Sequence, residues 1–341
     1  SEFYQVQQIN ITQLSSIPDV AVLMVNKPKE RFSREDKYKL DQYIMRGGKV
    51  MFFIDPLFIE MDSIGENGSI AFPYDLNLDD MLFRYGVRIN KTLVQEIKSG
   101  VYPFVVGEVG GQPQIAPLQW PFFPIVNRYG DHPTVKNMDA LFLQFVSNVD
   151  TVLADGINKT PLVFTSEYSR VLQTPMIVDL MELREAPRPE RFDDGPQAIA
   201  YLLEGKFTSV FKNRMLPDIA SSSSFREQSE PSKIVVVADG ELVRNEIDRE
   251  TAEPLPLSYD PISDQNFANE EFIINTLSYL TDENGLINAR AKEIQIRPLD
   301  QVKIERQATT WQMINLLLPI VLILIFGFLK AYLRKRKYTA H

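Results

Sequence analysis

Two aspartates stand where an open α/β sheet most often binds a ligand. Asp55 ends the apolar run KVMFFID, and Asp239 ends the apolar run IVVVAD. Ligands of such sheets usually lie beyond the carboxyl ends of the strands, where a carboxylate can hydrogen-bond a sugar or another polar molecule. Asp55 and Asp239 are therefore candidate ligand-binding residues. The alternative interpretation is local, because Asp-Pro and Asp-Gly pairs are common in turns.

Other chemistry finds less support. His132 follows Asp131, and an imidazole can serve as a general acid or base near neutral pH. However, Pro133 indicates a turn, and no G-x-S-x-G sequence supplies a nucleophile. With no cysteine and only two histidines, the chain lacks the residues for a thiol nucleophile, a Cys-ligated zinc or a His-rich metal site. We expect no catalytic residue, no metal and no cofactor.

An aromatic cluster is a second candidate site. Trp120, Phe122 and Phe123 occur in the string QWPFFP. They could contact a partner, or they could cover the edge of a core, as such residues often do. The whole stretch from Gly100 to Pro133 is rich in proline, which predicts a loop. Within it, Gly110-Gly111 predicts a hairpin or loop.

The elements that would position these residues alternate between strand and helix. Asp19 to Val25 and Lys49 to Asp55 have the continuous apolar character of strands buried on both faces. Between them, Ser33 can cap a helix that ends at Gly47-Gly48, so a parallel crossover is expected. A second helix with an apolar face, from Leu78, should end at Gly86.

The pattern continues along the chain. Further expected strands and helices are listed in chain order: strands at 141–146, 161–165, 176–180 and 234–238, and helices at 197–203 and from Asn269, which can act as its cap. This alternation indicates an α/β domain with a mainly parallel sheet, flavodoxin-like in size. Of 341 residues, 44% are hydrophobic and 24% charged, as in globular proteins. The net charge of −9 argues against nucleic acid as a partner.

The C-terminal region predicts a membrane anchor. Residues 311–329 contain no charge, and a helix needs about 20 apolar residues to cross a hydrocarbon layer about 30 Å thick. We assign a transmembrane helix to 306–333 and a basic tail to 334–341. The expected membrane-interface anchors are Trp311, Tyr332, Arg334, Lys335, Arg336 and Lys337. Asn315 could hydrogen-bond a neighbouring helix, which makes it a candidate partner contact.

The basic tail also predicts orientation. Lysine and arginine near a span resist translocation, so the C-terminus should be cytoplasmic and residues 1–305 should lie outside the cytoplasm. That domain forms one body or two lobes with a break near 187–196. The first residues have neither a charged nor an apolar export signal, so we expect upstream sequence to be missing or removed. The alternative is a tail-anchored protein facing the cytoplasm, which would require the basic tail to cross the membrane.

Several strings together resemble the GldG-type, gliding-motility-associated auxiliary proteins of ABC transporters in Bacteroidetes. The strings are KYKLDQYIMRGGKVMFFID, PLQWPFFPIVNRYGDHP, LLEGKFTSVFKNR, SKIVVVADGELVRNE and FANEEFIINTLSYL. The resemblance implies a periplasmic α/β auxiliary domain on the inner membrane that associates with a permease and an ATPase. The chain itself has no G-x-x-x-x-G-K-[ST] loop for ATP.

The function expected from the resemblance is binding and coupling rather than catalysis, with the lipid bilayer as a further partner and the small-molecule ligand unknown. The alternative is an exported glycan-modifying hydrolase on a flavodoxin-like fold.

Overall fold

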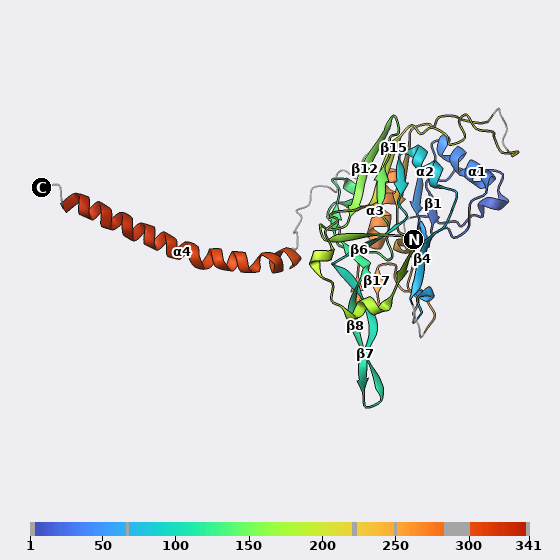
Figure 1. Cartoon of the computed structure of the whole chain (residues 1–341). Coiled ribbons are helices and arrows are strands. Elements are labelled where there is room, and N and C mark those ends of the chain that lie inside the picture. Colours follow the sequence, from blue (N-terminus) through green and yellow to red (C-terminus); the bar gives the residue numbers. More distant parts are fainter. Residues whose placement is uncertain (1–3, 66–67, 220–223, 249–250, 283–300, 339–341) are drawn as a thin grey trace. The chain divides into compact units, whose positions relative to one another are not determined.

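The chain forms two compact units. The structure, a computed structural model, describes residues 4–65, 68–219, 224–248, 251–282 and 301–338 (Figure 1). The units are Ser1–Lys292 and Glu293–His341. The first contains the described sheets, and the second contains the long helix α4 (Gln301–Tyr338). The break expected near 187–196 falls inside the first unit.

A six-stranded mixed sheet is the centre of the first unit. Its order is β1 (Leu23–Asn26), β2 (Val50–Phe53), β16 (Ser232–Val237), β15 (Ala198–Gly205), β12 (Ile157–Phe164) and β9 (Arg128–Tyr129). β1, β2 and β16 are parallel to one another, whereas the pairs β16–β15, β15–β12 and β12–β9 are antiparallel. The unit is α/β with several mostly antiparallel sheets, so the prediction of a mainly parallel sheet is wrong.

One misassigned segment explains much of that error. Of residues 197–203, predicted as a helix, 198–203 belong to strand β15. Alanine and leucine favour helices, but by less than about 1 kcal/mol per residue over most other residues. β15 pairs with β16 on one side and β12 on the other, so hydrogen bonds along both of its edges outweigh that local preference.

The helices begin and end largely as their sequences predict. α1 (Arg34–Met45) is capped by Ser33, whose Oγ accepts a hydrogen bond from the Asp36 N–H at 3.0 Å. α2 (Asp79–Tyr85) ends at Gly86, which has a φ of 112° that suits glycine. Both predictions are confirmed.

α3 (Asn269–Thr281) differs at its start, because Ala268 occupies the cap position. The Asn269 side chain instead bonds the backbone of Phe142, donating to its carbonyl at 2.8 Å and accepting from its N–H at 3.0 Å. The predicted Asn269 cap is therefore wrong. The asparagine ties the helix to a neighbouring strand rather than to its own first turn.

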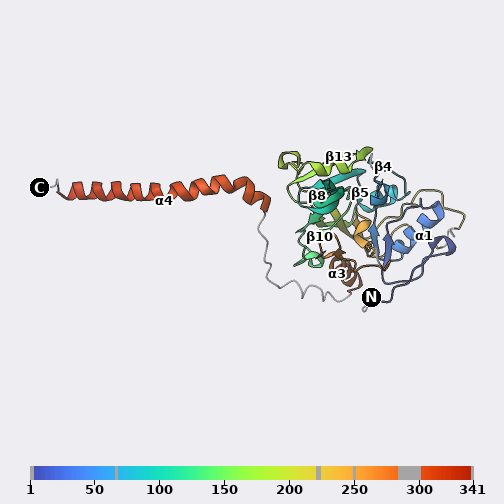
Figure 2. The same ribbon diagram turned by 90° about the horizontal axis from the view of Figure 1, so that it is seen from below.

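Helices cover both faces of the central sheet. Successive side chains of a strand point to opposite faces. Val50 and Phe52 of β2 belong to one core cluster with residues of α1 and α2, and Met51 and Phe53 belong to another with residues of α3. Figure 1 and the turned view of Figure 2 accordingly place α1 and α3 apart in the first unit. The sheet is thus the middle layer of three.

A long hairpin extends from this body. β7 (Ser99–Val109) and β8 (Gln112–Val126) pair antiparallel and form a projecting arm (Figure 1). The loop predicted from its prolines is wrong, whereas the predicted hairpin turn at Gly110-Gly111 is confirmed, with φ of 64° and 81°. Pro103 lies opposite Pro117. Two prolines can face each other at a pair that exchanges no N–H bonds, so they do not interrupt the ladder.

Smaller elements complete the first unit. The remaining strands are β3 (Leu57–Phe58), β4 (Ser69–Pro73), β5 (Val87–Ile89), β6 (Thr92–Glu96), β10 (Leu141–Phe142), β11 (Val149–Thr151), β13 (Ser169–Gln173), β14 (Met176–Val178), β17 (Tyr259–Asp260) and β18 (Gln265–Asn266). The 3₁₀ helices are η1 (Ile11–Gln13), η2 (Met61–Ser63), η3 (Pro133–Val135), η4 (Leu180–Arg184), η5 (Pro189–Arg191) and η6 (Glu241–Val243). Strands β10, β12, β14 and β16 overlap the strands predicted at 141–146, 161–165, 176–180 and 234–238.

Candidate functional site

The three parallel strands bring charged residues to one edge of the sheet. Lys27 follows β1 directly, Asp55 lies two residues after β2, and Asp239 lies two residues after β16. Parallel neighbours end at the same edge, so the fold places both predicted aspartates together, beyond the carboxyl ends of their strands.

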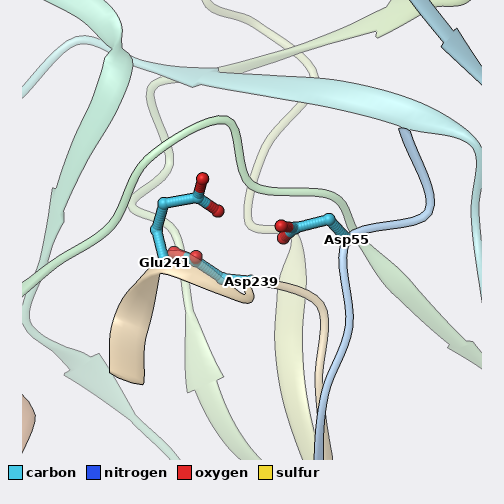
Figure 3. Close-up of side chains that lie close together, drawn as sticks. All are labelled: Asp55, Asp239 and Glu241. Carbon is cyan, nitrogen blue, oxygen red and sulfur yellow. The ribbon is translucent and has the colours of Figure 1, made fainter. Parts of the chain in front are cut away.

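A third carboxylate joins them. Glu241 is the first residue of η6, directly after the Asp239-Gly240 turn. One carboxylate oxygen from each of Asp55, Asp239 and Glu241 lies within 4.8 Å of the others. Figure 3 shows the three side chains turned toward one another. We call these three residues the acidic cluster. It is buried, with exposed fractions of 7% for Asp55, 0% for Asp239 and 8% for Glu241.

Backbone donors hold two of the carboxylates. Asp239 accepts hydrogen bonds from the Gln144 and Leu242 N–H groups, each at 3.1 Å. Asp55 Oδ1 accepts one from the Gly240 N–H at 2.5 Å. A Cβ on Gly240 would lie 2.7 Å from Asp55 Oδ2 and 2.8 Å from the Lys27 side chain. Glycine is therefore required there by close approach, not by its backbone angles.

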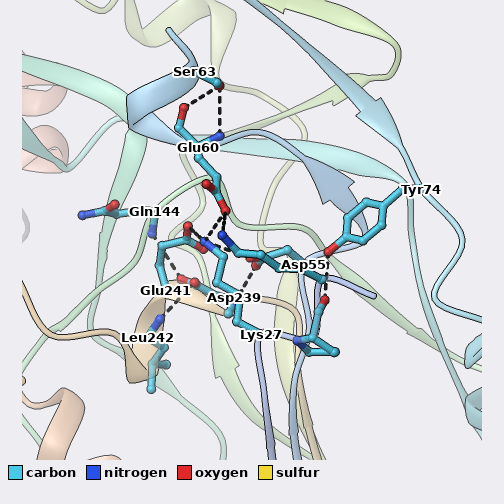
Figure 4. A network of polar contacts seen from close by, with 12 residues as sticks. Lys27, Asp55, Glu60, Ser63, Tyr74, Gln144, Asp239, Glu241 and Leu242 are labelled. Atoms are coloured by element: carbon cyan, nitrogen blue, oxygen red, sulfur yellow. Dashed lines mark hydrogen bonds and ion pairs between the residues drawn. The ribbon is translucent and has the colours of Figure 1, made fainter. Parts of the chain in front are cut away.

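Lys27 is the cation of the site. Its Nζ forms a short hydrogen-bonded ion pair with Glu241 Oε1 and lies 3.5 Å from Asp55 Oδ2 and 3.6 Å from Glu60 Oε1. Glu60 also pairs with the exposed Lys29 at 2.6 Å. Figure 4 shows this network, in which Tyr74 donates a hydrogen bond to the Pro28 carbonyl beside the cluster.

Burial and like charges perturb the acidic groups. Burial, followed by the charge of Asp55, raises the pKa of Asp239 to about 8. Burial and the charges of Asp55 and Asp239 also raise the pKa of Glu241 well above its ordinary value, although Lys27 acts against this. For Lys27 itself, burial lowers the pKa, but the charges of Glu241 and Asp55 outweigh it and leave that pKa raised. The cluster therefore favours protons or another cation beside Lys27.

One oxygen of the cluster lacks a hydrogen-bond donor. Asp55 Oδ2 is buried and accepts no hydrogen bond. Lys27 Nζ approaches it only as the 3.5 Å ion pair. A buried acceptor without a donor costs about 1–3 kcal/mol, so such atoms are rare unless a proton, water or ion satisfies them. A proton on Glu241 or a cation could do so here.

The space beside the cluster is small. A cavity of about 40 Å³ is lined by Lys27, Asp55, Glu60, Tyr74 and their neighbours in the chain. Pockets for organic ligands usually have volumes of about 300–1,000 Å³. The cavity therefore has room for a few water molecules but not for a sugar.

A larger groove lies elsewhere in the first unit. Its volume is about 960 Å³, and its lining includes Asp79, Asp80, Phe83, Lys91 and Arg214. The charges pair internally, with Asp79 bound to Lys91 at 2.9 Å and Asp80 to Arg214 at 2.6 Å. Neither Asp55 nor Asp239 lines it, so the groove and the acidic cluster are separate features.

His132 has a structural place. Its Nδ1 lies 2.9 Å from Thr134 Oγ1 and accepts from the Thr134 N–H at 3.4 Å, and its ring meets Tyr279 edge-on at 4.6 Å. Burial lowers the pKa of this imidazole. Asp131 is exposed and pairs with Lys136 at 3.2 Å. The two neighbours in sequence therefore do not form an acid–base pair.

The aromatic candidates are buried. Trp120 and Phe122 are 0% exposed and Phe123 is 3% exposed. Their rings pack with Phe145 at the base of the β7–β8 hairpin, with the Trp120 and Phe123 centroids 4.9 Å apart. The structure therefore agrees with the alternative interpretation, in which these rings cover a core, and not with contact to a partner. The rings are buried because strand β8 directs them toward Phe145 and the rest of this core.

The C-terminal candidates all lie on α4. Within it, Gln307–Leu333 is long and apolar enough to span a membrane. Trp311 and Tyr332 are near its two ends, 57% and 65% exposed, and Asn315 is also exposed. The residues Arg334, Lys335, Arg336 and Lys337 continue the same helix, and their side chains lie outside the described residues.

Sequence reasoning missed Lys27, Glu60 and Glu241. A signal existed for Glu241, since it stands two residues after Asp239 in the string ADGEL. Lys27 also follows an apolar strand, but a lone lysine there gave no reason to pair it with a distant carboxylate. Glu60 is brought in by the chain after β2, and no local pattern predicts this.

Comparisons with known proteins identify the family. Residues 1–276 match the model of ABC transporter auxiliary domains, described as "ABC-type uncharacterized transport system". A solved structure, "mmIFT52 N-terminal domain", covers 78% of this chain and 79% of its own, with 10% identity and a TM-score of 0.38, too distant to support an argument. A search of curated proteins gives no match. On the family match, the chain belongs to the ABC-type transport-system auxiliary family and is an auxiliary component of such a system.

Proposed function

We propose that this chain is a membrane-anchored, non-enzymatic subunit on the periplasmic side of a bacterial inner membrane, which binds an ABC permease and its ATPase and couples them to gliding motility. The observation that carries the proposal is the family match over residues 1–276 together with an apolar helix at the C-terminus. Membership implies association with components of an ABC-type transport system. The motility role rests on the resemblance to GldG-type proteins alone.

The anchor supports the proposed location. Gln307–Leu333 is 27 residues long, which is about 40 Å of helix and enough to cross a hydrocarbon layer of about 30 Å. Basic residues follow on one side only, from Lys330 to Lys337. Such a cluster favours a cytoplasmic C-terminus and hence a periplasmic first unit.

The described contacts favour binding over catalysis. Asp55 of the acidic cluster borders a cavity of only about 40 Å³, and His132 is used as a helix cap. The family is typically non-catalytic. The alternative of a glycan-modifying hydrolase would need a sugar-sized cleft at paired carboxylates, and the acidic cluster does not border one.

Co-purification tests the partnership. The chain, expressed in a Bacteroidetes host with an affinity tag, should retain a multi-span permease and an ATPase in mild detergent. Asn315→Leu should reduce the recovered permease several-fold, because an intramembrane asparagine can hydrogen-bond a neighbouring helix. The matched control is Leu316→Ile, which should leave recovery unchanged. Recovery of the chain without either partner would contradict the proposal.

Orientation and motility need separate measurements. A reporter fused after His341 should be active in the cytoplasm, and residues 1–276 should be protease-accessible in spheroplasts. Deletion of the gene should stop colony spreading while leaving growth intact. A deletion strain that spreads normally would remove the gliding role but leave the transporter role standing, whereas a periplasmic reporter would overturn the orientation.

A further inference from the structure

The donor set of the acidic cluster suits a hard divalent cation. Asp55, Asp239 and Glu241 offer one carboxylate oxygen each, with these oxygens within 4.8 Å of one another. Carboxylate oxygens are the ligands that calcium, magnesium and manganese prefer. We expected no metal because the chain lacks cysteine and has only two histidines. That argument concerned zinc-type ligands and did not weigh carboxylates.

One oxygen of the cluster accepts no hydrogen bond and has only an ion pair with Lys27 at 3.5 Å. Asp55 is 7% exposed, and its Oδ2 has no hydrogen-bond donor although Oδ1 of the same carboxylate is held by the Gly240 N–H. In Figure 3 the Asp55 carboxylate points toward Glu241 and Asp239. The backbone thus fixes the aspartate so that the oxygen without a hydrogen-bond donor faces the other two carboxylates, where an ion would coordinate it.

The charge balance is compatible with a divalent ion. With all three carboxylates ionised beside Lys27, two negative charges remain, and a bound M²⁺ would neutralise them. Without an ion, protons must offset this charge, in agreement with the raised pKa values of Asp239 and Glu241, so metal binding would displace protons. Glu60 does not change this balance, because the exposed Lys29 pairs with it at 2.6 Å.

The number of carboxylates favours Ca²⁺ over Mg²⁺. Calcium accepts about 6–8 oxygens in a flexible geometry, so three carboxylates and waters can bind it together. Magnesium requires a near-ideal octahedron, keeps several waters and usually binds through only one or two carboxylates. Asp55, Asp239 and Glu241 supply three. The adjoining cavity of about 40 Å³ exceeds the space of about 10–15 Å³ that one water requires, so waters can complete the coordination.

We propose that Asp55, Asp239 and Glu241 form a Ca²⁺ site in which Lys27 is a competing internal cation. Lys27 Nζ contacts Glu241 and lies 3.5 Å from Asp55, so it occupies part of the space an ion needs. Glu60 Oε1, 3.6 Å from the same nitrogen, offers an alternative partner when Ca²⁺ displaces it. This inference goes beyond the proposed function and does not depend on it.

Titration calorimetry of the full chain in mild detergent tests the site. The protein is freed of metal with a chelator and then titrated with CaCl₂ or MgCl₂ alone. We expect one Ca²⁺ per chain with a Kd of about 10⁻⁶–10⁻⁴ M, the range of sensor and weaker calcium sites, and at least tenfold weaker Mg²⁺. Absence of Ca²⁺ binding to the wild-type chain would overturn the proposal and leave a proton shared by Asp55 and Glu241 as the partner of Oδ2.

Variants with opposite expected signs separate ligation from misfolding. Asp239→Asn and Glu241→Gln keep side-chain shape and should weaken Ca²⁺ binding at least thirtyfold. Lys27→Met should tighten it at least fivefold, because it removes the competing charge while keeping much of the apolar stem. A gain of affinity cannot come from an unfolded chain. If Lys27→Met weakens binding, the lysine supports the site rather than competing, and the proposal fails.

The matched control is Asp80→Asn. Asp80 is a carboxylate paired with Lys37 and Arg214, away from the cluster, and its loss should leave the Ca²⁺ affinity within twofold of the wild type. Equal loss in Asp80→Asn and Asp239→Asn would show diffuse attraction to an acidic protein, and this outcome would also overturn the site. The motility and partner experiments have separate readouts, so their failure leaves this test unaffected.

Discussion

Two groups of buried carboxylates in the first unit differ in how many hydrogen-bond donors surround them. Asp41, on α1, is 0% exposed and accepts four hydrogen bonds. Its donors are Tyr85 Oη at 2.8 Å, Ser209 Oγ at 2.7 Å, the Val210 N–H at 2.9 Å and Gln42 Nε2 at 2.9 Å. The acidic cluster has three carboxylates, one lysine and an oxygen without a donor.

The difference shows that burial of a carboxylate does not by itself indicate a binding site. A single charge surrounded by donors joins α1, α2 and the chain after β15 into one structure, which is a packing role. In the acidic cluster, backbone N–H groups hold the carboxylates in place, but protons or a bound cation must offset the negative charge that Lys27 does not. The second arrangement costs stability unless something binds, which is typical of functional sites.

The largest loss of stability should come from a change at Asp41, whose carboxylate is fully hydrogen-bonded. Asp41→Ala leaves the buried Tyr85 and Ser209 hydroxyls and the Val210 N–H without their acceptor, so we expect a loss of about 4 kcal/mol in the free energy of unfolding. Denaturant unfolding of the full chain in detergent, followed by circular dichroism, measures it. Asp131→Asn, on an exposed carboxylate that pairs with Lys136, should stay within about 0.5 kcal/mol of the wild type. A loss below about 1 kcal/mol for Asp41→Ala would mean that the four hydrogen bonds do not support the fold.

Lys27→Met should cause the next largest loss in the free energy of unfolding. Without Ca²⁺ it leaves the buried acidic cluster without its cation, and we expect a loss of about 3 kcal/mol. Saturating Ca²⁺ should restore most of this loss, since the ion replaces the missing charge. The same unfolding experiment in chelator and in CaCl₂ measures both states. Equal losses in the two solutions would break the contrast with Asp41, because the cluster would then be structural as well.

The pH dependence of stability should also follow the cluster. Because the folded pKa of Asp239 is raised from 3.8 to about 8, the folded state binds the proton more tightly, so this stabilisation is complete below about pH 4 and is lost as the pH rises to about 8. In chelator, the free energy of unfolding should fall by about 1 kcal/mol per pH unit between pH 6 and 8. Asp239→Asn should flatten this slope. A wild-type profile without the slope would show that the carboxylate is already ionised.

The smallest expected effect concerns one donor of Asp41. Ser209→Ala removes one of four hydrogen bonds and should cost about 1 kcal/mol, because the other donors still satisfy the carboxylate. It should not alter Ca²⁺ affinity. Thermal unfolding with and without CaCl₂ gives both values. A Ca²⁺ affinity that changes with Ser209 would show that the two carboxylate groups are coupled rather than independent.

The predicted elements show how far local information reaches. Ser33, Gly86 and the apolar run at 234–238 place a helix start, a helix end and a buried strand correctly, because each depends on neighbours within one turn or strand. The length of the uncharged segment before Lys330 likewise predicts a helix able to span a membrane. Asp55 and Asp239 were found because each follows an apolar strand, which is visible in the sequence.

Other features depend on partners far away in the chain. Residues 198–205 are a strand because β16 and β12 pair with both of its edges, against a weak helical preference. The prolines of β7 and β8 are compatible with a hairpin only when set opposite suitable residues of the other strand. Glu60 and Lys27 join the acidic cluster through the order of β1, β2 and β16. The sequence by itself therefore determined the strands that end before Asp55 and Asp239, the Ser33 cap, the helix end at Gly86 and the long apolar helix, because their energies are local. Only the tertiary structure decided the sheet topology and which charges share one buried space, because these depend on pairing between segments that are remote in the chain.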